Sequence, residues 1–168
     1  RYQEVTEFRR VLFRSLPGVK PKITLKGHRR GVWSAAFSPV EQSLLTCSGD
    51  RSIRLWALRD GSCLRRLEGH TASVLKAVFC SFGTQVLSAG ADGLLKLWSV
   101  RSGECVNTFE NHDDKVWALD AGSGDGRFVA SGGGDGQITF WADATEEVRA
   151  EERKDRKSTR LNSSHLLI

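Results

Sequence analysis

The stretch GHTASVLKAVFCSFGTQVLSAGADGLLKLW, residues 69–98, decides the fold, because its key residues recur twice more in the chain. A histidine near its start, an aspartate before its last strand and a closing tryptophan repeat every 42 or 43 residues. These positions are His28, His70 and His112; Asp50, Asp92 and Asp135; and Trp56, Trp98 and Trp141. Three residue types that keep one period indicate tandem copies of one structural unit.

Each unit has the pattern of short strands joined by turns. Apolar runs of about five to seven residues alternate with Asp-Gly and Ser-Gly pairs, which favour hairpins. None of these runs shows the period of an amphipathic helix. The expected strands span 31–38, 43–48, 52–58, 63–67, 73–80, 85–89, 94–100, 105–109, 115–120, 127–131 and 137–141, with a leading strand near 22–26. The sequence therefore predicts an all-β fold.

The units resemble the WD-repeat (WD40) family, whose repeat opens with Gly-His and closes with Trp-Asp. Here the openings are Gly27-His28, Gly69-His70 and Asn111-His112, and the closing pairs are Leu55-Trp56, Leu97-Trp98 and Phe140-Trp141. Asn111 replaces the first glycine of the motif, and none of the tryptophans is followed by Asp. The resemblance implies three repeats over 22–58, 64–100 and 106–142, within a region 16–142. Closed propellers need about four to eight blades, so about three blades predict a partial, open β-propeller.

The recurring polar residues also form the inventory of a serine hydrolase, since each unit holds a histidine, a hydroxyl and an aspartate. A hydrolase needs one such set beside an oxyanion hole, whereas this chain repeats the set in every unit. The family resemblance implies structural hydrogen-bonded tetrads instead, and no enzyme. The tetrads are His28, Thr46, Asp50 and Trp56; His70, Ser88, Asp92 and Trp98; and His112, Ser131, Asp135 and Trp141.

Metal and cofactor sites are not expected. The three repeat histidines belong to different units and cannot converge on one ion. The glycine runs 122–126 and 132–136 match no phosphate-binding motif, so they are predicted to be turns. The four cysteines form no C-x-x-C pair and are predicted to be small buried hydrophobes, with equivalent packing for Cys63 and Cys105. No small-molecule substrate is expected.

The charge is polarised rather than uniformly basic. The formal net charge is +5, but residues 16–154 carry only +1 because each end of the chain adds +2. Within the middle, 16–66 hold ten basic and three acidic residues, and 104–152 hold three basic and twelve acidic residues. We therefore expect RNA contact to be indirect or weak. No apolar run is long enough for a membrane span, and no signal peptide is evident, so no membrane partner is expected.

The family resemblance also implies where partners bind. In WD-repeat proteins, side chains near the start of the innermost strand line the face that contacts partners, which corresponds here to Arg30, Trp33, Lys115 and Trp117. An aromatic ring beside a cation is typical of binding hot spots. The alternative is that both tryptophans pack between blades.

Residues outside the repeat motif are similar to one nucleolar group of WD-repeat proteins. They lie in 34–39, 53–58, 72–76, 83–93, 114–117 and 140–147. This similarity implies a scaffold in the small-subunit processome, where pre-18S ribosomal RNA is processed, with partners from that large ribonucleoprotein assembly and its U-three small nucleolar ribonucleoprotein. The alternative is an adaptor of a signalling or ubiquitin-ligase complex that binds peptide partners.

The ends of the chain differ in character from the repeats. Residues 143–154 begin with a capping-box pattern and predict the start of a C-terminal helix. Residues 1–15 and 155–168 share no period with the middle and resemble translated sequencing adapter, so both are interpreted as non-native.

Overall fold

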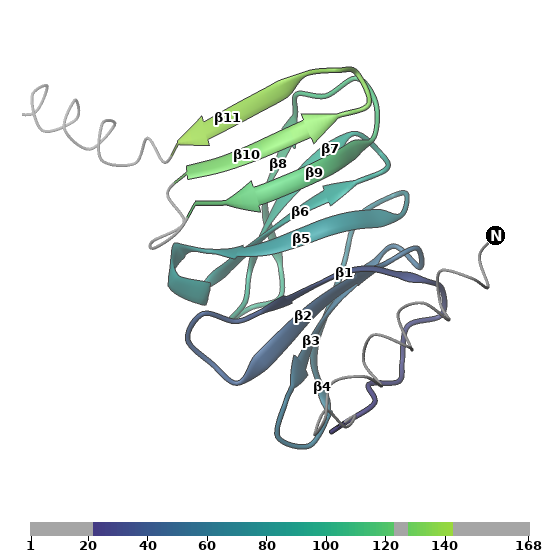
Figure 1. Ribbon diagram of the computed structural model, residues 1–168, viewed down its shortest axis with the longest axis vertical. Helices are drawn as coiled ribbons and strands as arrows, with labels where there is room; N and C mark the ends of the chain where they lie inside the picture. Colours follow the sequence, from purple (N-terminus) through teal and green to yellow (C-terminus); the bar gives the residue numbers. More distant parts are fainter. Residues whose placement is uncertain (1–21, 123–127, 143–168) are drawn as a thin grey trace, which may run out of the picture.

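The computed structural model describes residues 22–122 and 128–142, and the expectations for 1–15, 143–154 and 155–168 lie outside this part. The described chain forms three antiparallel sheets that follow one another along the longest axis of the molecule (Figure 1). The first holds β1 (Val32–Phe37), β2 (Ser43–Ser48), β3 (Ser52–Ala57) and β4 (Cys63–Glu68) in chain order. The second holds β5 (Val74–Cys80), β6 (Gln85–Gly90), β7 (Leu94–Ser99) and β8 (Cys105–Glu110). The third holds β9 (Val116–Ala121), β10 (Phe128–Gly133) and β11 (Ile138–Ala142).

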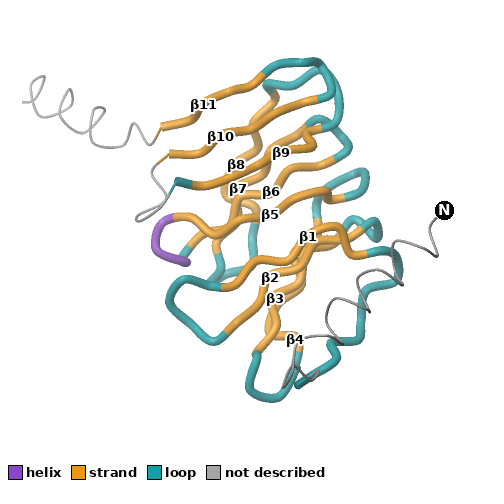
Figure 2. Tube along the Cα trace, in the orientation of Figure 1, coloured by secondary structure: helices purple, strands orange, loops and turns teal. Residues whose placement is uncertain are grey.

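These sheets are the blades predicted from the period, and the expected all-β, open architecture is confirmed. The innermost strands β1, β5 and β9 contact one another in sequence, so the blades fan out from a common inner edge. In residues 22–122 and 128–142 the regular elements are strands joined by loops, as Figure 2 shows, apart from a short 3-10 turn, Ser81–Gly83. The sequence did not predict this turn. It depends on left-handed φ angles of +48° at Ser81 and +53° at Phe82, which few residues other than glycine adopt.

The prediction of a leading strand near 22–26 is wrong, because these residues form no strand. A strand needs a neighbour to complete its ladder of hydrogen bonds, and no neighbour is present for this segment in the described structure. Its apolar side chains instead contact the turn between β3 and β4. A Cβ added at Gly61 would lie 2.9 Å from Ile23 Cγ2 and 3.3 Å from Leu25 Cδ2.

The hydrophobic core lies between blades rather than within them. One buried cluster joins the first two blades through Leu45, Ile53, Leu67, Val74 and Val86. A second cluster joins the last two blades through Leu87, Leu95, Val116, Leu119 and Val129. The middle blade is therefore covered on both sides, whereas apolar side chains such as Phe37 and Ile138 stay exposed on the outer blades.

Two of the four cysteines depart from the predicted burial. Cys47 and Cys80 are buried, but Cys63 and Cys105 are exposed at the start of β4 and β8, the outermost strands of their blades. Their equivalence nevertheless holds, because each Sγ donates to the carbonyl oxygen two residues later at 3.3 Å. Small apolar character thus predicts burial only where a neighbouring blade covers the strand.

Candidate functional site

Each blade contains one continuous chain of polar side-chain contacts. In the middle blade, Trp98 Nε1 donates to Ser88 Oγ at 2.8 Å, and Ser88 Oγ lies 2.8 Å from His70 Nε2. His70 Nδ1 lies 2.9 Å from Asp92 Oδ2. An indole N–H can only donate, so the Ser88 hydroxyl accepts a hydrogen bond from Trp98 and donates one to His70 Nε2. The remaining proton on Nδ1 is then donated to the carboxylate.

The other two blades repeat this arrangement with the predicted residues. In the first blade the three contacts measure 2.8 Å from Trp56 Nε1 to Thr46 Oγ1, 2.8 Å from Thr46 Oγ1 to His28 Nε2, and 3.0 Å from His28 Nδ1 to Asp50. In the third blade each contact measures 2.9 Å, and the partners are Trp141, Ser131, His112 and Asp135. The structure thus brings together all twelve residues that the period singles out.

The aspartates also close the turn in which they lie. Asp92 accepts from the backbone N–H of Thr71 at 2.9 Å and of Leu94 at 3.3 Å. Burial alone would raise the pKa of Asp92, but hydrogen bonds from His70 and from these N–H groups hold it at about 2. The pKa of Asp50 is lowered against the opposing effect of burial, mainly by the Ser52 hydroxyl and the Arg29 N–H. That of Asp135 is lowered chiefly by the Gln137 N–H.

This geometry is structural rather than catalytic. The hydroxyls of Ser88 and Ser131 belong to residues that are 0% and 1% exposed, so no substrate reaches them. Each also accepts the indole proton of its tryptophan, which lowers its value as a nucleophile. Because every buried donor and acceptor of the tetrad has a partner, the set rigidifies the blade.

The first blade carries two serines that the sequence period does not point to. Ser52 Oγ donates to Asp50 Oδ1 at 2.6 Å, and Ser48 Oγ donates to the carbonyl of Arg30 at 3.2 Å. The positions equivalent to Ser48 are Gly90 and Gly133. The contrast between serine and glycine at one repeat position could have marked the first blade as different.

Six turns that lie beside the tetrads gather at one end of the blades. We call the surface formed by these turns the turn face. It consists of 29–31, 49–51, 71–73, 91–93, 113–115 and 134–136. Within each blade its two turns are joined by a backbone hydrogen bond. These bonds are Gly49 N to Gly31 O at 3.0 Å, Ala91 N to Ser73 O at 2.8 Å, and Gly134 N to Lys115 O at 2.8 Å.

The four residues predicted to bind partners lie on or beside the turn face. Trp33 and Trp117 are 60% and 57% exposed, so neither indole is packed between blades in the described structure. Lys115 Nζ lies 5.9 Å from the Trp117 ring, a cation–π contact. Arg30 and Trp33 flank Gly49, where an added Cβ would lie 3.5 Å from Arg30 Cβ and 3.3 Å from Trp33 Nε1.

A hollow opens on the turn face between the first two blades. Its volume is about 630 Å³, and its lining residues are Arg29, Arg30, Gly49, Asp50, Arg51, Thr71, Ala72 and Ser73. Of these, sequence reasoning named only Arg30 as a binding residue. Arg51 had a visible signal, since Gly93 and Gly136 occupy the same position in the other repeats.

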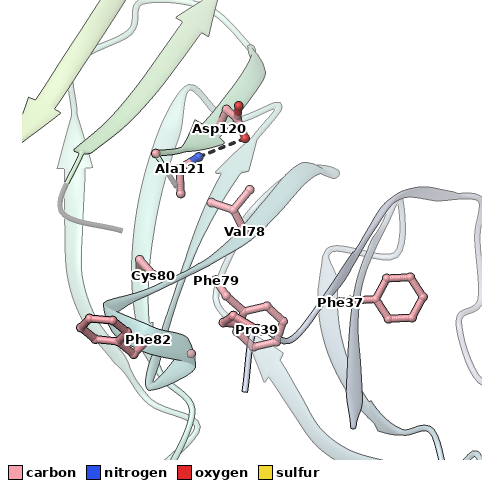
Figure 3. A pocket seen from close by; sticks show the side chains of 10 residues that line it. Phe37, Pro39, Val78, Phe79, Cys80, Phe82, Asp120 and Ala121 are labelled. Atoms are coloured by element: carbon pink, nitrogen blue, oxygen red, sulfur yellow. Dashed lines mark hydrogen bonds between the residues drawn. The ribbon is translucent and has the colours of Figure 1, made fainter. Parts of the chain in front are cut away.

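A smaller hollow of about 220 Å³ lies at the opposite end of the blades (Figure 3). Phe37, Pro39, Phe79 and Phe82 line it, together with the chain around Asp120. Asp120 Oδ1 accepts from the N–H of Ala121 at 3.1 Å. Asp120 is the one charged residue among those that line this hollow, so this hollow offers fewer charged groups than the hollow on the turn face.

Metal and membrane features are not seen in the described residues. No group of three or more histidine, cysteine, aspartate or glutamate side chains in 22–122 and 128–142 is arranged to hold a metal ion. No helix in this part of the chain has the length and apolar character needed to cross a membrane.

Comparison with known proteins gives one family and several partial relatives. The family model described as "WD domain, G-beta repeat" matches residues 19–57, 61–99 and 103–142. A probable cytosolic iron-sulfur protein assembly protein CIAO1 homolog from Ixodes scapularis is 50% identical over 38 residues, 23% of this chain and 12% of that protein. Eukaryotic translation initiation factor 3 subunit I from Aspergillus niger is 38% identical over 42 residues, 25% of this chain and 12% of that protein.

Striatin-4 from Homo sapiens is 50% identical over 32 residues, which is 19% of this chain and 4% of that protein. Each of these matches is about one repeat long. The matched part of the chain spans 12% or less of these three relatives.

Proposed function

The chain belongs to the WD40 repeat family, and we propose that it serves as a non-enzymatic scaffold that holds other proteins on its turn face. The observation that carries this proposal is the contrast between the tetrads and that face. The tetrads satisfy their own polar groups and fix the blades, while the aromatic and charged groups of the turn face remain open to a partner.

We propose that Arg30, Trp33, Lys115 and Trp117 anchor the bound protein. Exposed tryptophans beside cations have the composition of interface hot spots, where a few aromatic and arginine side chains supply most of the binding energy. The tetrads hold the first and third blades rigidly, so these anchors lose little conformational freedom when a partner binds.

The test of this role is affinity purification of the full chain from cells, with Trp33→Ala/Trp117→Ala as the variant. We expect the variant to lose most of its protein partners while its thermal unfolding temperature stays within a few degrees of the wild type. Phe82→Ala is the matched control, because Phe82 is an equally exposed aromatic at the opposite end of the blades. Unchanged partner recovery with the double variant would show that the turn face is not the binding surface.

The finer proposal is that this scaffold works in the nucleolar small-subunit processome. It rests on the similarity of 34–39, 53–58, 72–76, 83–93, 114–117 and 140–147 to the last repeats of transducin beta-like protein three, also called U-three small nucleolar RNA-associated protein thirteen. We propose a nucleolar location, partners from that ribonucleoprotein assembly, and weak or indirect RNA contact, in keeping with the near-neutral charge of 16–154.

Co-purified material distinguishes this assignment from the alternative adaptor role. Recovery of U-three small nucleolar RNA together with processome proteins is the result we expect. Recovery of ubiquitin-ligase or kinase subunits without that RNA would favour the adaptor and exclude the processome assignment. Either outcome leaves the broader scaffold role in place, because that role is tested separately by the tryptophan variant.

A further inference from the structure

Arg51 occupies a backbone position that the other two repeats give to glycine. Its φ angle is +68°, and the equivalent Gly93 and Gly136 have φ angles of +78° and +77°. A side chain is strained in this left-handed region, whereas glycine is not. The first blade therefore tolerates backbone strain at a turn where it presents a guanidinium group, and such strain is typical of functional positions.

Arg51 does not stand alone, because Arg29 and Arg30 line the same hollow. All three are exposed, and no ion pair joins any of them to a carboxylate among residues 22–122 and 128–142. The carboxylate that lines the hollow, Asp50, already accepts from His28, from the Ser52 hydroxyl and from the Arg29 N–H. The hollow thus holds three cations whose side-chain donors bind no other side chain within the described parts of the chain.

The other residues that line the hollow have small side chains, and two of them carry a hydroxyl group. Thr71, Ala72 and Ser73 line it from the second blade, and the Trp33 indole stands at its edge over Gly49. Ser73 Oγ would lie 3.6 Å from a Cβ at Gly49, so the two blades approach closely at this point. An exposed indole beside a guanidinium cluster suits a segment that carries both a carboxylate and an apolar side chain.

The charge of the turn face changes sign across the three blades. The two positions after the tetrad histidine hold Arg29 and Arg30 in the first blade and Thr71 and Ala72 in the second. In the third blade they hold Asp113 and Asp114. A uniformly charged polymer that ran along this face would be attracted at one end and repelled at the other.

We propose that the hollow between the first two blades binds an acidic protein segment, whose carboxylates pair with Arg29, Arg30 and Arg51. This inference rests on the proposed scaffold role and adds the chemistry of the partner. Arginine forks bind carboxylates in a bidentate manner, and the hollow is large enough for a few side chains. The aspartates of the third blade disfavour an acidic stretch long enough to reach that blade, so the segment is acidic where it meets the first blade.

The test measures binding of a fluorescein-labelled octaglutamate peptide to the full chain by fluorescence anisotropy at low ionic strength. Arg51→Gly restores the glycine of the other repeats and relieves the strain. Arg59→Gly is the matched control, because it removes the same charge from the turn between β3 and β4 at the opposite end of the blade. Arg29→Gln/Arg30→Gln is a second variant that leaves the backbone at Arg51 unchanged.

We expect Arg51→Gly to weaken octaglutamate binding about fivefold or more, and Arg59→Gly to weaken it less than about twofold. Arg51→Gly should also unfold at the same temperature as the wild type or higher, which a purely structural role for Arg51 would not allow. Equal losses with the two variants, or no octaglutamate binding, would overturn the proposal.

Labelled octauridylate separates a protein ligand from a nucleic acid. Tighter binding of octauridylate than of octaglutamate, weakened by Arg29→Gln/Arg30→Gln, would assign the hollow to phosphate groups and refute an acidic protein segment. If octaglutamate fails to bind while Trp33→Ala/Trp117→Ala still loses its partners, the scaffold role stands and only the acidic-segment inference is wrong.

Discussion

Gly90 lies directly against Asp92 in the middle blade, so closely that a Cβ on Gly90 would overlap the Asp92 carboxylate and stand 2.5 Å from His70 Nδ1. Gly133 has the same relation to its own pair, with an added Cβ 2.5 Å from Asp135 Oδ1 and 2.6 Å from His112 Nδ1. Hydrogen bonds lock these side chains, so they cannot move aside without losing a partner. In the middle blade the tetrad geometry therefore depends on the absence of a side chain at Gly90, whereas the first blade forms its tetrad with Ser48 at the equivalent position.

Gly90→Ala should lower the free energy of unfolding by about 1–3 kcal/mol, because the added methyl group separates His70 from Asp92 and leaves a buried donor unpaired. Chemical denaturation measures the change. The control is Gly31→Ala, since no atom lies within 4 Å of a Cβ at Gly31. Equal stability of both variants would show that the tetrad tolerates the displacement.

Asp92→Ala should destabilise the middle blade by about 2–3 kcal/mol, since His70 Nδ1 and the N–H groups of Thr71 and Leu94 lose their acceptor. A thermal melt followed by circular dichroism gives the change. Glu104→Ala removes an exposed carboxylate and should change stability by less than about 0.5 kcal/mol. A melt of Asp92→Ala that matches the wild type would contradict the structural role of the tetrad.

Stability should fall as the pH drops from about 4 to about 2. The pKa of Asp92 is about 2 in the folded chain, whereas an unfolded aspartate titrates near 3.9. A carboxylate with a lowered pKa contributes stability above its unfolded pKa, and that contribution disappears as pH falls through the folded value. The pKa values of Asp50 and Asp135 are also lowered, so they act in the same direction.

Urea denaturation at several pH values measures this dependence. Asp92→Asn is the control, because it should be less stable at pH 7 and should show a shallower loss between pH 4 and 2. An identical slope in the variant and the wild type would mean that Asp92 makes no contribution to acid sensitivity.

The folded chain should react with iodoacetamide at Cys63 and Cys105 and stay unmodified at Cys47 and Cys80. The first two are exposed, whereas burial raises the pKa of the Cys47 thiol to about 12 and that of Cys80 to about 11. The thiolate is the reactive form, so burial and a raised pKa both protect the inner pair. Peptide mass spectrometry after labelling identifies the sites, and unfolding in urea should expose all four. Modification of Cys47 before unfolding would disagree with its position in the core.

The tetrads were accessible from the sequence because of their periodicity. Buried polar groups need partners, so residues that keep one spacing through three repeats and match a known motif predict one shared set of contacts. The strands were equally predictable, since alternation and turn chemistry are local properties. Residues 22–26 show where prediction from local sequence fails. A strand also needs a neighbouring strand to pair with, and the sequence of the segment does not say whether that neighbour is present.

The arginine hollow was only partly predictable. Arg30 and Trp33 were expected to bind from their place near the innermost strand, but Arg29 and Arg51 were not. The hollow joins residues from two turns of the first blade to Thr71, Ala72 and Ser73 of the second. A concave shape formed across blades depends on packing distances that a linear period does not contain.

The histidines of the second and third tetrads follow the outermost strand of the preceding blade, as His70 follows β4 and His112 follows β8. A repeat such as 61–99 therefore begins in one blade and ends in the next. Each repeat supplies the outer strand of one blade and the inner strands of the next, so it contacts both neighbouring repeats. Duplication of such a unit in a gene can therefore lengthen a propeller without a new kind of interface. During synthesis the same offset means that a blade leaving the ribosome can complete its outer strand only when the following repeat emerges.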